Sequence, residues 1–161
     1  ASVKVREYAI GALLERDPEN LRTLFSRMED EQPSIQRLIC KHLGKQRSPM
    51  AQRLLMDYLG KKRVKIKNRE HILDCYRALG RCAGPDAIPF LRENLLKRNW
   101  KALLGLADDP HREGAAVTLL LMPKEWKTDG ILRKAAGSFF PGIRRAYREG
   151  EMKVPKSLRR A

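Results

Sequence analysis

Basic side chains are concentrated in two stretches of the sequence, where they could bind an anionic partner. Residues 61–69 hold six basic residues and no acidic one: Lys61, Lys62, Arg63, Lys65, Lys67 and Arg69. The second stretch, near the C-terminal end, contains Arg144, Arg145 and Arg148. The whole chain has 34 lysine and arginine residues against 19 acidic ones, a formal net charge of +15. This excess suits nucleic-acid phosphates, an acidic protein surface or anionic lipid, although charge runs are also common as solvated helix faces.

Among these partners, an acidic protein surface fits the sequence best. Single-stranded nucleic acid stacks on aromatic side chains placed among basic ones, and residues 61–69 contain no aromatic residue. The sequence also shows no zinc finger, recognition helix or RNA-binding signature. Nucleic acid is the alternative partner, and its contacts would be to backbone phosphates, weakly specific and salt-sensitive.

His71 and Cys75 lie four positions apart, so on a helix both side chains could reach one metal ion. Two ligands do not make a site, and no second pair has suitable spacing. A surface histidine beside a core cysteine is the simpler interpretation. We therefore expect neither a metal nor a cofactor.

Asp108, Asp109 and His111, which follow Trp100, form the only cluster that suggests catalysis. The simpler interpretation is that one of the aspartates caps a helix that begins near Pro110. The sequence contains no phosphate-binding glycine loop and no nucleophile elbow. We therefore expect a protein that is not an enzyme.

Trp100 and Trp126 fall in predicted loops. Each would either close an edge of the hydrophobic core or stand exposed as the anchor for a partner, because tryptophan is frequent at binding hot spots. The core interpretation is the favoured one for both residues.

The elements that must position these residues are helices, and the clearest pair lies in residues 69–97. In its first helix Ile72, Tyr76 and Leu79 recur at steps of four and three, which is the period of a helix with one apolar face. Three apolar residues between 88 and 95 do the same in the second helix. We expect Gly80 to end the first helix with a positive φ.

The same pattern recurs along the chain. Leu43-Gly44 repeats as Leu79-Gly80, which lies 36 positions later, and a proline turn separates the helices of each pair. We expect Ser34 and Ser48 to cap helices in the earlier copies and Asp86 to cap the second helix of the central pair. The spacing of about 30–36 residues is typical of stacked helical repeats.

The segment Tyr76–Leu91, YRALGRCAGPDAIPFL, resembles the HEAT-like repeat family, in the short form found in bacterial proteins and phycobilisome lyases. Weaker copies cover residues 3–60, and a more divergent one covers 108–149. The resemblance implies an all-α fold, an α-solenoid of about four to five helix pairs similar to HEAT and armadillo superhelices. It says little about activity, because unrelated proteins use this repeat as a scaffold. A lyase-type enzyme or a DNA glycosylase of the HEAT-like kind is a further alternative.

Residues 1–149 are predicted to form this repeat domain, and residues 150–161 a basic tail. The first helix, Val3 to Arg16, is expected to turn Val5, Ala9, Ala12 and Leu13 inward. It reads as the second helix of a repeat whose first helix is missing. Because the chain also starts at Ala1 without methionine, we expect it to be the C-terminal part of a longer protein.

Composition sets the remaining limits. The three cysteines, Cys40, Cys75 and Cys82, form no CxxC pair, which indicates reduced thiols and a cytoplasmic protein. No apolar run is long enough for a membrane span. The sequence therefore predicts a cytoplasmic, non-enzymatic binding or scaffold module that presents a basic surface to an acidic protein partner.

Overall fold

The computed structural model describes residues 2–16, 20–26, 32–61, 68–97, 109–123, 126 and 130–131. Within these ranges the chain forms helices and no strand, so the all-α prediction is confirmed. The α-helices are α1 (Val3–Arg16), α2 (Asn20–Ser26), α3 (Pro33–Gln46), α4 (Pro49–Lys61), α5 (Arg69–Cys82), α6 (Ile88–Leu96) and α8 (Pro110–Leu121). A short 3-10 turn, Pro85–Ala87, leads into α6. None of the described helices combines the length and hydropathy needed to cross a bilayer.

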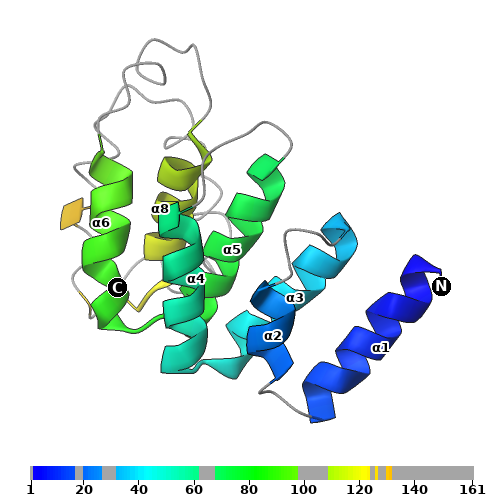
Figure 1. Cartoon of the computed structure of the whole chain (residues 1–161). Helices are drawn as coiled ribbons and strands as arrows, with labels where there is room; N and C mark the ends of the chain where they lie inside the picture. Colours follow the sequence, from blue (N-terminus) through cyan, green and yellow to red (C-terminus); the bar gives the residue numbers. More distant parts are fainter. Residues whose placement is uncertain are drawn as a thin grey trace, which may run out of the picture.

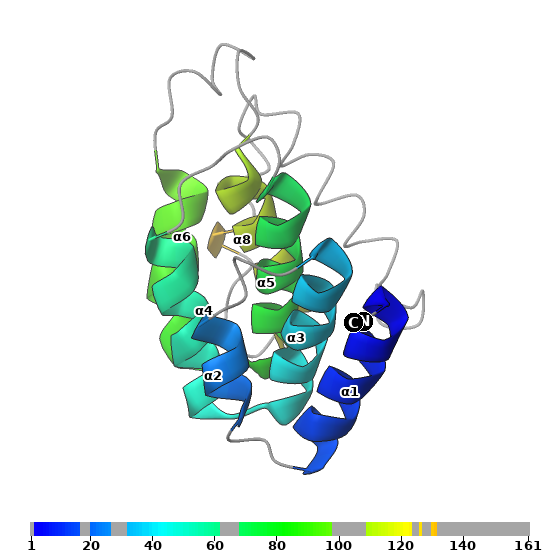
Figure 2. The ribbon, with the colours of Figure 1, turned by 45° about the vertical axis from the view of Figure 1, so that its right-hand side comes forward.

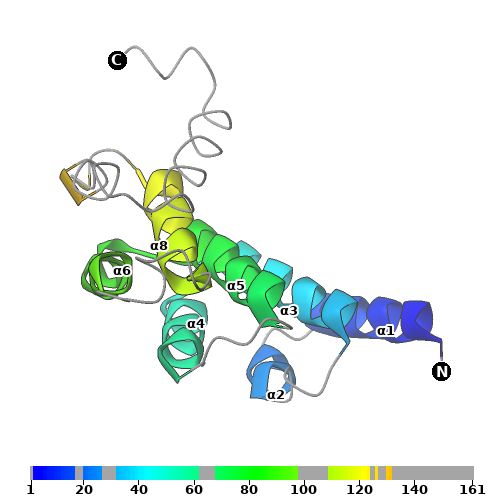
Figure 3. The same ribbon diagram turned by 90° about the horizontal axis from the view of Figure 1, so that it is seen from above.

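The helices lie in two rows (Figure 1, Figure 2). Seen from above, α1, α3, α5 and α8 form one row, and α2, α4 and α6 lie along one side of it (Figure 3). Helix α5 is central, because it packs against α3, α4 and α8. Helix α1 lies in the same row as α3 and α5. The prediction that α1 is the second helix of a repeat stays a prediction, although α1 does not lie in the row of α2, α4 and α6.

Neighbouring helices of the first row run in the same direction. Cys40 of α3 faces Cys75 of α5, and one turn further along, Gly44 faces Ala78. Cys40 and Cys75 are 35 residues apart in the sequence, and Gly44 and Ala78 are 34 apart. Because this separation hardly changes along the contact, α3 and α5 are parallel and almost in register. Helix α8 continues the row on the other side of α5, where Gly80 approaches Thr118.

The two Leu-Gly pairs mark places where helices of this row approach each other closely. Both glycines lie inside helices, because α3 continues to Gln46 and α5 to Cys82. A Cβ atom on Gly44 would lie 3.2 Å from the backbone of Ala78, and one on Gly80 would lie 3.1 Å from Leu121 Cδ1. The expectation that Gly80 ends its helix is wrong: the glycine lies inside α5, where it faces Thr118 and Leu121 of α8 at close range.

The predicted apolar stripes of the central helices form the core. Their largest side chains are fully buried because each stripe faces both the neighbouring helix of its row and the second row. They are Ile35, Ile39, Leu43, Leu55, Leu59, Ile72, Tyr76, Leu79, Leu91 and Leu95. This part of the helix prediction is confirmed.

Helix α1 packs through a different face from the predicted one. Leu14 is buried against the core and Ile10 is half-buried, whereas Val5 is 60% exposed and Leu13 is 42% exposed. Ala9 and Ala12 also face solvent. The helix carries apolar residues on more than one side, so periodicity alone does not select the side that packs.

The predicted helix starts are partly correct. Ser48 caps α4, where its Oγ accepts a hydrogen bond from the backbone N–H of Ala51 at 3.1 Å. Helix α3 already begins at Pro33, so Ser34 lies inside it and caps nothing. Asp86 falls within the 3-10 turn and makes no cap for α6.

Candidate docking surface

The structure describes two of the six predicted basic residues in 61–69. Lys61 is exposed at the end of α4, and Arg69 begins α5. The other four, Lys62, Arg63, Lys65 and Lys67, lie outside the described residues. Arg69 donates hydrogen bonds to Glu70 Oε1 at 2.6 Å and to Glu113 Oε2 at 2.7 Å. Its charge is thus matched within the chain, and it links α5 to α8.

The other predicted site residues are mostly outside the described ranges. Arg144, Arg145, Arg148 and Trp100 belong to this group. Trp126 is half-buried and packs against the hydrophobic core. This contact agrees with the core interpretation, and the role of Trp126 as a partner anchor stays a prediction.

A basic surface lies instead on the outer sides of α3 and α5. Arg37, Lys41 and Lys45 are exposed at steps of four on α3, which places them along one helix face. Arg77 and Arg81 occupy the corresponding side of α5. We call these five residues, together with Asp74, the α3–α5 face. With five basic residues and one acidic one, it has a formal net charge of +4.

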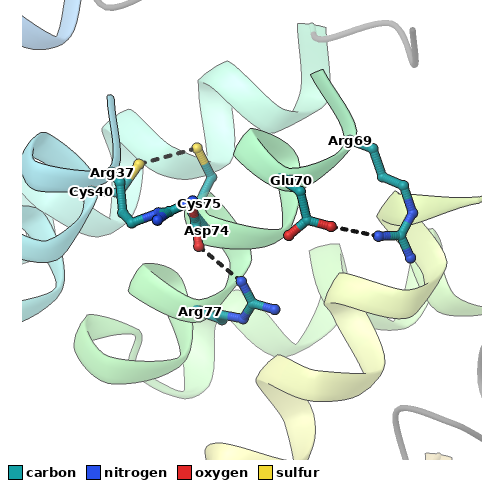
Figure 4. A network of polar contacts seen from close by, with 7 residues as sticks. All are labelled: Arg37, Cys40, Arg69, Glu70, Asp74, Cys75 and Arg77. Carbon is teal, nitrogen blue, oxygen red and sulfur yellow. Dashed lines mark hydrogen bonds and ion pairs between the residues drawn. The ribbon is translucent and has the colours of Figure 1, made fainter. Parts of the chain in front are cut away.

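Asp74 holds two of the basic side chains in place across the helix boundary. Its Oδ2 accepts a hydrogen bond from Arg37 Nε at 3.2 Å. Its Oδ1 accepts one from Arg77 Nη1 at 2.8 Å (Figure 4). The Arg37 side chain is still 68% exposed and that of Arg77 is 40% exposed. Because a guanidinium has five N–H donors, both arginines keep donors for an external carboxylate or phosphate.

Arg81 extends the face along α3. A Cβ atom on Gly44 would lie 3.4 Å from Arg81 Cδ. The aliphatic part of the Arg81 side chain therefore packs over Gly44, the position of α3 that carries no side chain. Gly44 directly precedes Lys45 and follows Lys41 by three residues. The missing side chain therefore lets the basic groups of the two helices share one surface.

Sequence reasoning missed this arrangement. Lys41 and Lys45 contribute to the basic excess between residues 41 and 69, where ten basic residues accompany only Asp57. The usable signal was the step of four in each helix, from Arg37 to Lys45 and from Arg77 to Arg81. The parallel register that joins the two stripes is a tertiary feature that neither helix encodes alone.

The acidic cluster considered for catalysis serves as a helix cap. Asp109 precedes α8, and its Oδ1 accepts a hydrogen bond from the backbone N–H of Arg112 at 3.2 Å. The capping interpretation is therefore confirmed for Asp109, and Asp108 lies outside the described residues. Next to the cap, His111 Nδ1 and the Tyr76 hydroxyl lie 3.2 Å apart. Burial, and secondarily the charge of Asp109, raises the pKa of Tyr76 far above its usual value, so the phenol stays neutral.

The pair His71 and Cys75 gains a third neighbour from another helix. Cys40 Sγ of α3 lies 3.5 Å from Cys75 Sγ, and Cys75 Sγ lies 3.7 Å from His71 Nε2. The ligand atoms of all three residues lie within 4.8 Å of one another, and all three residues are buried. The Tyr58 hydroxyl is 2.9 Å from the same His71 nitrogen.

Comparisons with family models, with curated protein sequences and with solved structures each returned no match for this chain. The resemblance to HEAT-like repeats therefore stays a prediction from the sequence.

Proposed function

We propose that this chain is a helical-repeat binding module whose α3–α5 face docks on an acidic protein surface, and that it is not an enzyme. The observation that carries this proposal is the occurrence of five basic side chains on the adjacent helices α3 and α5, two of which, Arg37 and Arg77, are bound to Asp74. Exposed guanidinium groups suit carboxylates, with which they form paired, charge-assisted hydrogen bonds. Asp74 orients the Arg37 and Arg77 guanidinium groups before a partner binds.

The proposal includes a solenoid arrangement of the helix pairs. Three features support it: the chain alternates between the two rows, α3 and α5 are parallel, and a glycine in α3 and in α5 marks each close approach. In such arrays each unit packs only on its neighbours, which leaves long helix faces open for binding. Helix α1 also leaves Val5, Tyr8 and Leu13 exposed, and this side is suited to a further helix or to a protein partner.

An acidic protein is favoured over nucleic acid for two reasons. The α3–α5 face contains no aromatic residue on which a base could stack. The sequence also contains no zinc finger, recognition helix or RNA-binding signature. Cytoplasmic location is part of the proposal, because Cys40 and Cys75 face each other as thiols, as expected in a reducing compartment.

A binding titration with two probes tests the proposal. Fluorescence anisotropy would compare labelled poly-glutamate with a labelled DNA duplex at matched salt. We expect saturable binding of poly-glutamate that weakens as salt is raised, because exposed charges are screened over about 10 Å at 0.1 M. Tighter binding of the duplex would favour the nucleic-acid alternative, and binding of neither probe at low salt would refute the docking role.

A further inference from the structure

Two cysteines and a histidine meet in the interior between α3 and α5, apart from the exposed basic groups. We propose that Cys40, His71 and Cys75 bind one thiophilic d10 metal ion, Zn²⁺ or Cu⁺. Thiolate and imidazole ligands favour these ions over hard cations such as Mg²⁺ or Ca²⁺. This inference does not depend on the docking function.

Two of the three ligand-to-ligand distances already match those between ligands that share a metal. With Zn–S bonds of about 2.3 Å and Zn–N bonds of about 2.0 Å in a tetrahedron, two sulfurs lie about 3.8 Å apart and a sulfur and a nitrogen about 3.5 Å apart. The structure has 3.5 Å between the two Sγ atoms and 3.7 Å between Cys75 Sγ and His71 Nε2. The two cysteines already face each other (Figure 4). Cys40 Sγ and His71 Nε2 lie within 4.8 Å, and a metal ion would draw these two side chains together.

Rigid elements hold the three ligands. His71 and Cys75 are one helical turn apart on α5, so both side chains project from the same side of that helix. Cys40 comes from α3, whose parallel packing brings it level with Cys75. All three residues are at least nine-tenths buried, and a metal there would be shielded from bulk solvent.

Aromatic neighbours define the rest of the site. The rings of Tyr58 and His71 meet edge to face at 5.5 Å, and Phe25 meets Tyr58 in the same way at 5.3 Å. When His71 Nε2 binds a metal, the Tyr58 hydroxyl that now contacts this nitrogen is left beside the ion. It can then supply a fourth oxygen ligand directly or through water, as Zn²⁺ requires. Three soft ligands are enough for Cu⁺.

The test uses the reduced full-length chain under anaerobic conditions, with Co²⁺ as a spectroscopic substitute for Zn²⁺. We expect one Co²⁺ per chain, with thiolate-to-metal charge transfer and the intense visible bands of a tetrahedral site. Zn²⁺ should displace it. In a separate titration, the chain should remove one Cu⁺ ion from a competing chelator if Cys40, His71 and Cys75 are the only ligands.

Single substitutions with a matched control locate the ion. Cys40→Ser and Cys75→Ser should each lower the affinity by more than about 100-fold, because loss of even an outer-shell partner costs 10–100-fold. Cys82→Ser is the control, since Cys82 is another buried cysteine of α5 that lies outside the cluster. Its affinity should equal that of the unaltered chain.

A second measurement avoids any folding defect of these variants. In the unaltered chain, bound metal should slow the alkylation of Cys40 and Cys75 and leave that of Cys82 unchanged. Failure of both Zn²⁺ (with Co²⁺) and Cu⁺ to bind at one per chain would overturn the proposal. Equal loss of affinity in Cys82→Ser and Cys75→Ser would do so as well.

Discussion

Replacing Gly114 with alanine tests the close packing of α5 and α8. Gly114 faces the ring of Tyr76, which is fully buried. An added Cβ atom would overlap the Cγ and Cδ2 atoms of this ring and would lie 2.8 Å from the Tyr76 Cβ atom. A rotation of the tyrosine side chain cannot move its Cβ, so the two helices must separate.

The magnitude follows from two opposing effects. Overpacking of a core costs about 1–3 kcal/mol, and the upper end applies here because the clash involves an atom fixed to the backbone. The gain in helix propensity from glycine to alanine is about 1 kcal/mol. We therefore expect the free energy of unfolding to fall by about 2 kcal/mol, which corresponds to roughly 4–8 °C in Tm for a chain of this size.

Thermal and urea unfolding followed by circular dichroism would measure this change, and other helical glycines provide the controls. Gly11→Ala should be slightly stabilising, because nothing lies within 4 Å of the added atom. Gly44→Ala should be intermediate, since Ala78 backbone atoms lie 3.2 Å away. Equal effects of Gly114→Ala and Gly11→Ala would refute the reasoning that these glycines set the helix contacts.

Three further predictions concern single side chains. Asp109→Ala should lower the free energy of unfolding by about 0.5–2 kcal/mol, because it removes the cap that accepts the Arg112 N–H. Thr118→Val should cost about 1 kcal/mol, since it removes the buried 2.7 Å hydrogen bond to the Tyr76 carbonyl oxygen. His42→Gln should make stability less sensitive to pH below 6.5. Urea unfolding of each variant beside the unaltered chain would measure all three.

The direction of the His42 effect follows from its surroundings. Burial lowers the pKa of His42 from 6.5, as do Lys45 and Lys41, while Glu15 acts in the opposite sense. The unfolded chain therefore binds the proton more readily than the folded chain. The contribution of His42 to the free energy of unfolding is therefore fully present above pH 6.5, and it is lost as the pH falls below this value. If the free energy of unfolding of His42→Gln depended on pH as that of the unaltered chain does, this reasoning would be contradicted.

Asp86→Ala should leave the free energy of unfolding unchanged, because Asp86 caps no helix.

The sequence predicted the helices well because burial follows the helical period wherever a helix has one apolar side. Ile72, Tyr76 and Leu79 illustrate this, since their spacing alone predicted a buried face and all three are fully buried. Helix α1 shows the limit of the argument. Its apolar residues surround much of the helix, so only the position of α3 decides that Leu14, and not Leu13, is buried.

The candidate sites were less predictable because they depend on contacts between helices. The Leu-Gly repeat was recognised, but the role of Gly80 in packing required the position of α8. Cys40 is 35 residues from Cys75, and no local spacing links it to the pair on α5. The α3–α5 face likewise needs two helices in register before Arg37 and Arg77 can share Asp74.

The most direct test of the docking role compares two charge-reversed proteins for binding of poly-glutamate. One carries Lys41→Glu, Lys45→Glu and Arg81→Glu on the α3–α5 face. The control reverses three exposed basic residues on other helices, with the same change in net charge: Arg16, Arg22 and Arg92. We expect the face variant to lose roughly 10- to 100-fold in affinity, from three contacts of about 0.5–1 kcal/mol each, and the control to keep most of its binding. Equal losses in the two proteins would show that net charge alone attracts the probe, and would contradict the proposed docking surface.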